Sequence, residues 1–201
     1  MSINVSDFVW QRLPEWGGNR VYCYPGDGVG GLDVALEKVK DSLQYIQICH
    51  EEMAAFMASA HAKFTSQIGL SYATSGPGAT HLLTGLYDAK MDHVPVVAVV
   101  GQQARTAIGA HYQQEMDLQS LFKDVAGDFI ATASMPSRLR HLIDRTVRIA
   151  STKRTVTRVI IPNDLQELTY EDSPLAHGTT ISSIAMRTAD RIRALARRGE
   201  L

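Results

Sequence analysis

Three ionisable residues in a row, His50, Glu51 and Glu52, stand where an apolar strand pattern changes into an alanine-rich helix pattern. Acidic residues in the first turn of a helix are ordinary, because they complement the helix dipole and its free N–H groups. This accounts for one of the two glutamates. The other glutamate is a candidate functional residue if packing buries it. Burying a carboxylate costs free energy unless a partner interacts with it.

The helical spacing indicates that Glu51 is that residue. Positions 51, 54, 55, 58 and 62 share one helix face, and all of them after the glutamate are alanine. Such small side chains predict that another element packs closely against the face. A carboxyl group in that seam is suited to share a proton with a ligand. A plain charged helix start remains the alternative.

Two glycine-rich turns follow predicted strands. The first, residues 25–31, reads Pro-Gly-Asp-Gly-Val-Gly-Gly and matches the dinucleotide pattern G-x-G-x-x-G, with Glu51 about twenty residues later. Because Pro25 stiffens the turn and Glu51 belongs to the packed alanine face, a dinucleotide-binding domain is the weaker interpretation. The second, residues 75–78, reads Ser-Gly-Pro-Gly. It is either a tight turn that starts a helix with a side-chain cap, or a backbone segment that a planar ligand can approach closely.

The bulk composition limits the classes of function. The 201 residues carry a formal net charge of -1, which gives no electrostatic case for nucleic acid. No apolar run approaches the roughly 20 residues of a membrane helix, and the N-terminus lacks a secretion signal. Cys23 and Cys49 are both expected in strands as small core residues. The histidines are too scattered along the chain to predict a metal site. A cytoplasmic protein is expected.

Strand and helix patterns alternate up to residue 166, which predicts an α/β fold with a parallel sheet and helices on both faces. Beyond it, residues 168–183 have the composition of a linker, and residues 184–200 form a basic amphipathic pattern. The expected strands are 20–24, 43–48, 68–74, 94–100, 129–133 and 155–161. The expected helices are 8–13 (ended by Pro14), 32–40, one from 51, 79–91, 118–125 and 136–151, with a long loop over 101–115.

Four motifs in one order resemble the N-terminal, pyrimidine-binding domain of thiamine diphosphate enzymes of the pyruvate oxidase, quinone-dependent pyruvate dehydrogenase and acetolactate synthase group. The motifs are residues 50–56 (His-Glu-Glu-Met-Ala-Ala-Phe), 73–81 (Ala-Thr-Ser-Gly-Pro-Gly-Ala-Thr-His), 85–90 (Gly-Leu-Tyr-Asp-Ala-Lys) and 92–97 (Asp-His-Val-Pro-Val-Val). The resemblance covers residues 3–166. It implies a flavodoxin-like thiamine diphosphate-binding fold.

The resemblance also implies roles for individual residues. Glu51 is the catalytic glutamate that activates the cofactor by a hydrogen bond to its pyrimidine ring. The implied cofactor-binding set is Pro25, Gly26, Glu51, Thr74, Gly78, His81 and Gln114. No metal ligand is implied, because Gly-Asp-Gly at 26–28 lacks the downstream asparagine of the family's metal motif. The family's usual phenylalanine before the glutamine is Gln113 here, which leaves the substrate open.

The implied enzyme is larger than this chain. Residues 1–166 are expected to form the pyrimidine-binding domain, and residues 167–201 a linker and the first helix of a central domain. The cofactor diphosphate and its Mg2+ would be held by another domain, in a homodimer or tetramer acting on pyruvate or another 2-keto acid. FAD, and a membrane-peripheral location, stay open for the full-length enzyme. Alone, the chain is expected to be inactive. An inert dimeric regulatory module using the alanine face is the alternative.

Overall fold

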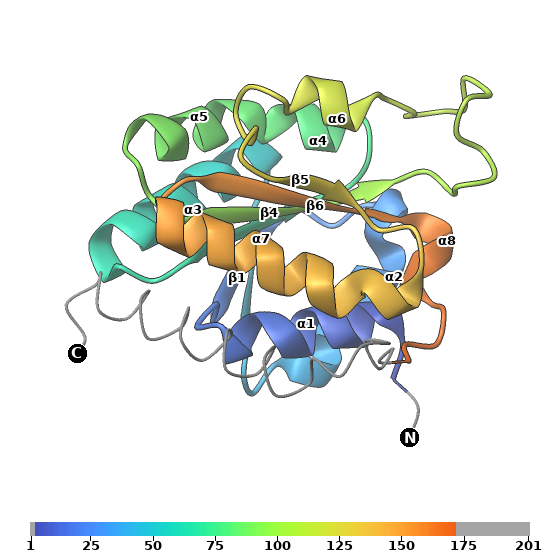
Figure 1. Ribbon diagram of the computed structural model, residues 1–201, viewed down its shortest axis with the longest axis horizontal. Helices are drawn as coiled ribbons and strands as arrows, with labels where there is room; N and C mark the ends of the chain where they lie inside the picture. The colour runs from blue at the N-terminus through green and yellow to red at the C-terminus, as the bar shows by residue number, and fades with distance from the viewer. Residues whose placement is uncertain (1–2, 172–201) are drawn as a thin grey trace, which may run out of the picture.

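The structure, a computed structural model, describes residues 3–171 (Figure 1). Six strands form one sheet in the order β2-β1-β3-β4-β6-β5, and every neighbouring pair is parallel. This confirms the predicted parallel α/β fold. The strands are β1 (Arg20–Cys23), β2 (Gln44–Gln47), β3 (Gly69–Ala73), β4 (Val96–Gln102), β5 (Ile130–Thr132) and β6 (Val156–Pro162).

Helices cover both faces of the sheet, each over its own apolar core (Figure 1). One layer holds α3 (Glu51–Thr65), α4 (Pro77–His81), α5 (Leu83–Met91) and α6 (Leu118–Leu121). The other holds α1 (Val5–Glu15), α2 (Gly30–Leu36), α7 (Leu139–Lys153) and α8 (Asn163–Gln166). Three short 3-10 turns complete the set: η1 (Asp27–Val29), η2 (Glu37–Val39) and η3 (Pro136–Arg138).

The strand order determines where a ligand can bind. Strands β3, β4 and β6 are buried along their whole length, as a parallel sheet covered on both faces requires. The chain runs from β1 outward to β2 and then returns to place β3 on the other side of β1. Such a switch point leaves a crevice at the carboxyl ends of the two strands, where open α/β sheets bind ligands. The loops after β1 and β3 carry both glycine-rich turns.

Several element boundaries differ from the sequence-based expectation. Pro14 does not end α1 but lies inside its last turn, where the absent N–H costs one hydrogen bond and the helix closes at Glu15. Helix α2 stops at Leu36 and tightens into η2. The expected helix over 79–91 starts at Pro77 and is divided at Leu82. Strand β4 continues to Gln102, which was expected in a loop, and α8 was not predicted.

The two cysteines behave differently. Cys23 is buried in β1, as predicted, whereas Cys49 is exposed. The prediction for Cys49 was wrong because β2 ends at Gln47, so the alternation of inward and outward side chains stops before that residue.

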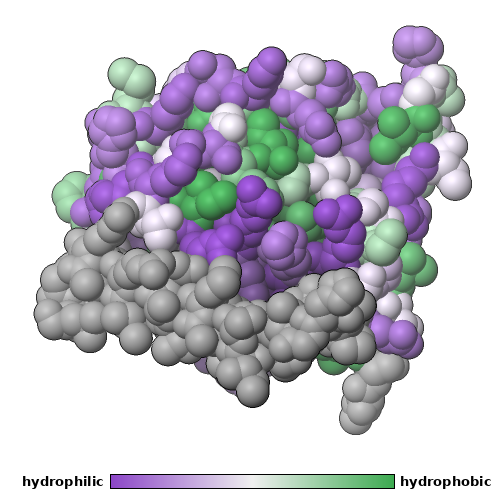
Figure 2. Space-filling view, viewed as in Figure 1, coloured by the Kyte–Doolittle hydropathy of each residue, from purple (hydrophilic) through white to green (hydrophobic). Residues whose placement is uncertain are grey.

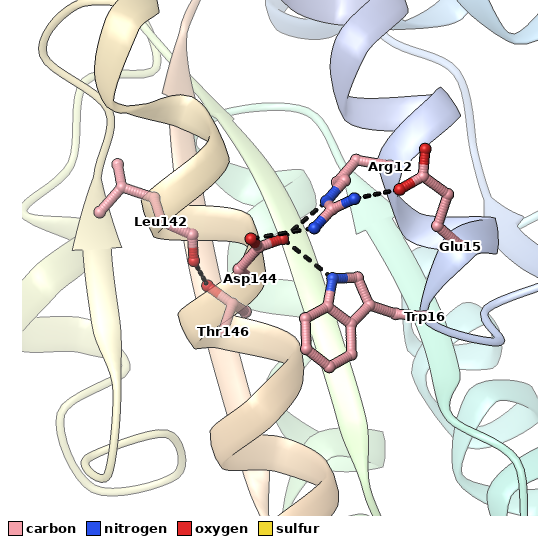
Figure 3. A network of polar contacts seen from close by, with 6 residues as sticks. All are labelled: Arg12, Glu15, Trp16, Leu142, Asp144 and Thr146. Atoms are coloured by element: carbon pink, nitrogen blue, oxygen red, sulfur yellow. Dashed lines mark hydrogen bonds and ion pairs between the residues drawn. The ribbon is translucent and has the colours of Figure 1, made fainter. Parts of the chain in front are cut away.

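The first helix is joined to α7 by a network of polar contacts (Figure 3). The Arg12 guanidinium donates from Nε to Asp144 Oδ1 at 2.7 Å and from Nη2 to Oδ2 at 3.0 Å. Trp16 Nε1 donates to the same Oδ1 at 2.9 Å, and Arg12 also contacts Glu15. Two parallel N–H···O bonds to one carboxylate fix orientation as well as distance, so the network sets how α1 lies across α7.

Residues 168–170, expected to begin a linker, are packed against α1. Tyr170 stacks on Phe8 with ring centroids 3.8 Å apart, and Thr169 bridges to Asn4. The rest of the expected linker and the basic helix lie outside the described residues. Within residues 3–171, no helix has the length and apolar character needed to cross a bilayer. Where it is not covered by grey atoms, the face in Figure 2 is mostly hydrophilic, with apolar residues in small separate groups.

Candidate functional site

Helix α3 buries Glu51 as the sequence predicts. His50 is the N-cap, its ring nitrogen accepting from the Glu52 N–H at 3.4 Å, so the helix begins at Glu51. Glu51 is 7% exposed. The four alanines of its face, Ala54, Ala55, Ala58 and Ala62, are also buried. The carboxylate is therefore largely removed from solvent at the carboxyl edge of the sheet.

The elements that pack on the alanine face belong to the same chain. A Cβ added to Gly85 of α5 would lie 2.7 Å from Ala55 Cβ, and one added to Gly69 of β3 would lie 2.2 Å from the Ala58 carbonyl oxygen. The alanines are small because α5 and β3 approach so closely. This corrects the interpretation of the alanine face as a dimerisation surface, since it is already covered.

At the switch point Gly78 lies next to Glu51, and Thr74 lies next to both Gly78 and Gly26. A Cβ at Gly78 would lie 2.9 Å from Glu51 Oε1 and 2.6 Å from Thr74 Cγ2. A Cβ at Gly26, next to Pro25, would lie 2.6 Å from Thr74 Cβ. Both glycines are thus required by close packing. The structure brings the loops after β1 and β3 together around the carboxylate.

His81, at the end of α4, supplies the polar contact to Glu51. Its Nδ1 lies 3.0 Å from Glu51 Oε2. The His81 ring also stacks on His50, with ring centroids 4.4 Å apart and planes 27° from parallel. The placement of His81 near Glu51 was expected from the family resemblance, but its partnership with His50 was not.

The long loop brings Gln114 to the same place. Ser75 Oγ donates to Gln114 Oε1 at 3.4 Å. Gly76 has a φ of +62°, and a Cβ there would lie 2.7 Å from Gln114 Cβ, so only glycine allows the approach. Gln113 is exposed. The expected residues are thus linked through the two turns: Gly78 and His81 contact Glu51, Gly26 and Gly78 approach Thr74, and Gln114 packs on the turn that follows Thr74.

Sequence reasoning missed two glutamines that hold the loops of this cluster. Gln166 of α8 is 1% exposed, accepts from Gly31 N–H at 3.1 Å and donates to the Gly28 carbonyl at 2.9 Å. Gln103 donates to Ser75 Oγ at 3.1 Å. No local pattern marks either residue, because each acts on a turn that is distant in sequence.

His50, Glu51 and His81 are also the one group of potential metal ligands found in residues 3–171, with ligand atoms within 4.8 Å of one another. This corrects the view that the histidines are too scattered to come together. Two imidazoles and one carboxylate differ from the all-oxygen set that Mg2+ prefers. The cluster is therefore not a magnesium site.

A half-open cavity of about 490 Å³ adjoins the cluster on the β2 side. Pro25 belongs to both, and the cavity is also lined by Asp33, Lys40 and Tyr45. Burial raises the pKa of Asp33 to about 6, although a backbone hydrogen bond from Gly26 opposes the shift. One buried oxygen of Asp33 has no hydrogen-bond partner within the described part of the chain.

Comparison with known proteins agrees with this geometry. Residues 3–121 match the family model of the thiamine pyrophosphate enzyme N-terminal TPP binding domain, and the chain belongs to this family. It is 41% identical over 162 residues to pyruvate oxidase of Lactiplantibacillus plantarum, covering 80% of this chain and 27% of that protein. It is 40% identical over 155 residues to a putative thiamine pyrophosphate-containing protein of Bacillus subtilis (77% and 27%).

Acetolactate synthases are also similar. The chain is 33% identical over 164 residues to the isozyme 2 large subunit of Escherichia coli, covering 82% of this chain and 30% of that protein. The chain thus spans less than a third of the length of these curated relatives. It is a thiamine pyrophosphate enzyme N-terminal TPP binding domain, homologous to pyruvate oxidase and acetolactate synthase.

Proposed function

We propose that the cluster around Glu51 binds the pyrimidine half of thiamine diphosphate for the decarboxylation of a 2-keto acid, with pyruvate as the substrate. The observation that carries this proposal is the buried Glu51 carboxylate facing Gly78 at the sheet's switch point. A carboxylate in a dry seam can bond the N–H of a protonated ring nitrogen strongly, because little water competes. Glu51 is the catalytic residue of the proposal.

The residues present fit one half of the cofactor. The cluster offers a carboxylate, an imidazole, a hydroxyl, one amide side chain and close backbone at two glycines, which suit a flat ring with nitrogen donors. None of its seven members is a lysine or arginine, so it has no charge partner for a diphosphate. We therefore assign the diphosphate and Mg2+ to a second domain, from this protein or from a partner subunit.

When bound, thiamine diphosphate supplies a nucleophilic carbon that adds to the carbonyl group of a 2-keto acid. This chain's part is to bind the ring, exclude water and hold a proton at Glu51. Thr74 and the backbone at Gly26 and Gly78 would surround the ring, and Gln114, which packs against Ser75 and Gly76, would contact the substrate. Alone, the chain is expected to bind the cofactor weakly and to turn nothing over.

The remaining parts of the proposal concern the whole protein. Exposed apolar side chains on α3 and α5, including Met53 (52%), Phe64 (88%) and Met91 (72%), support a homodimer or tetramer. The 41% identity to a pyruvate oxidase supports pyruvate as substrate and FAD as a further cofactor of the assembly. Two cysteines without a disulfide support a cytoplasmic location.

Calorimetric titration with thiamine diphosphate and Mg2+ tests the proposal. The chain is titrated alone and after mixing with the diphosphate-binding domain of the Lactiplantibacillus plantarum enzyme. Binding is expected in the mixture, and Glu51→Gln is expected to abolish pyruvate turnover there. Glu52→Gln is the matched control, because Glu52 is in the same helical turn but its side chain is 40% exposed. Turnover that survives Glu51→Gln would overturn the proposal.

A further inference from the structure

The Glu51 carboxylate is held from one side only. Within the described residues, the one side-chain hydrogen bond of this carboxylate joins Oε2 to His81 Nδ1 at 3.0 Å. The other oxygen, Oε1, faces the position where a Cβ of Gly78 would be. The two oxygens thus have different surroundings, so the orientation of the carboxylate depends on His81.

The ring of His81 is in turn held by His50. The two imidazoles stack at 4.4 Å, although the His50 side chain is 50% exposed and that of His81 is 43% exposed. Residues so open to solvent contribute little to the core. Besides the N-cap bond of His50, the contacts that hold the two rings are the stacking between them and the bond of His81 to Glu51.

The hydrogen bonds assign a tautomer to each ring. His50 Nδ1 accepts from the Glu52 N–H at the start of α3, so a neutral His50 carries its proton on Nε2. His81 Nδ1 faces a carboxylate oxygen, which only accepts, so His81 carries a proton on Nδ1. The second assignment is the informative one, because free neutral histidine favours the Nε2–H form.

We propose that His81 is a positioning residue for Glu51, and that the His50 ring fixes the plane of His81. The inference rests on the proposed function, in which Glu51 activates the cofactor. A glutamate side chain has several rotatable bonds, and freezing them is costly unless a partner holds the group. Because His81 Nδ1 hydrogen-bonds Oε2 of Glu51, Oε1 is the oxygen that remains to face the ligand ring. A small displacement of a catalytic group is enough to slow a reaction strongly.

The first test needs no cofactor. Nitrogen-15 NMR of the chain at pH 8 reports which ring nitrogen of each histidine carries the proton. We expect His81 in the Nδ1–H form and His50 in the Nε2–H form. In the Glu51→Ala variant, His81 is expected to lose its preference for the Nδ1–H tautomer. A His81 in the Nε2–H form, or one unaffected by Glu51→Ala, would overturn the proposal.

The second test separates binding from activation in the mixture with the diphosphate-binding domain. The dissociation constant of thiamine diphosphate and the rate of hydrogen–deuterium exchange at its C2 atom are both measured. His81→Ala is expected to slow the exchange by about 10-fold or more while changing the dissociation constant by less than about threefold. His81→Asn restores a short N–H donor and is expected to recover part of the rate. His81→Phe keeps a ring but no donor and is expected to be as slow as His81→Ala.

The controls distinguish the two proposals. His141→Ala, an exposed histidine on α7 in the opposite helix layer, is expected to change neither quantity. If Glu51→Gln leaves the exchange unchanged, the proposed function is wrong. If Glu51→Gln stops the exchange but His81→Ala does not slow it, only the positioning role is wrong. Equal losses in His81→Asn and His81→Ala would also count against a donor role.

Discussion

The side-chain amide of Gln166 donates a hydrogen bond to the carbonyl oxygen of Gly28, 138 positions earlier in the chain, at 2.9 Å. The same side chain accepts from the N–H groups of Gly31 and Leu32. One buried residue of α8 thus holds the glycine-rich loop that carries Gly26 into the candidate site.

Replacing Gln166 with alanine is expected to lower the free energy of unfolding by about 2–3 kcal/mol, because it leaves buried backbone groups of the loop without partners. Urea denaturation measures the change. Gln119→Ala is the matched control, since Gln119 is exposed and bonds a side chain, Thr132, at 3.0 Å. Its loss is expected to cost less than about 0.5 kcal/mol. Equal effects would show that Gln166 does not hold the loop.

Gly78→Ala is expected to disturb the site directly. The added methyl group meets Glu51 Oε1 at 2.9 Å and Thr74 Cγ2 at 2.6 Å, so the carboxylate has to move. We expect a loss of about 1–3 kcal/mol in the free energy of unfolding and a large loss of cofactor binding. Gly30→Ala is the control, because nothing lies within 4 Å of its added Cβ and it begins α2. That variant is expected to be neutral or slightly more stable.

Gly85→Ala tests whether the alanine face of α3 is covered by α5. A Cβ at Gly85 would lie 2.5 Å from the backbone nitrogen of Phe56, which cannot move without the helix. The helices must separate, at a cost of about 1–3 kcal/mol in the free energy of unfolding. Thr84→Ala, at an exposed neighbouring position of α5, is expected to change stability by less than about 0.5 kcal/mol. A stable Gly85→Ala variant would mean that the two helices are not in close contact.

Asp33 predicts a pH dependence of stability. Burial raises its pKa from 3.8 to about 6, so between these values the folded state binds more protons than the unfolded state. The free energy of unfolding therefore falls through this group as pH rises from 4 to 6, and the penalty persists above pH 6. Asp33→Asn is expected to stabilise the chain at pH 7.5 by about 1 kcal/mol, after allowance for partial exposure, and to be neutral near pH 3.5.

Urea denaturation of both proteins across this pH range measures the difference. Asp41→Asn, at an exposed position beyond η2, is the control and is expected to change the free energy of unfolding little at either end. A stabilisation by Asp33→Asn that is the same at pH 3.5 and 7.5 would contradict the role of its charge.

The sequence by itself determined the order and type of most elements, and the members of the site are its prediction. The change from strand to helix at His50, the alanine face and the glycine-rich turns are local patterns that depend on side-chain period and backbone freedom. The family motifs then named the cluster that surrounds Glu51. These features were predictable because each depends only on residues that are close together in the sequence.

Only the tertiary structure decided which distant groups meet. Strand order places β3 beside β1, and this brings Gly78 and His81 to Glu51. It also showed that α5 and β3, rather than a second copy, cover the alanines. Gln166 reaches Gly28 because α8 follows β6 back across the carboxyl edge of the sheet. Such contacts depend on the crossover connections that set the strand order and on side-chain rotamers. Neither of these produces a periodic pattern of residue types in the sequence.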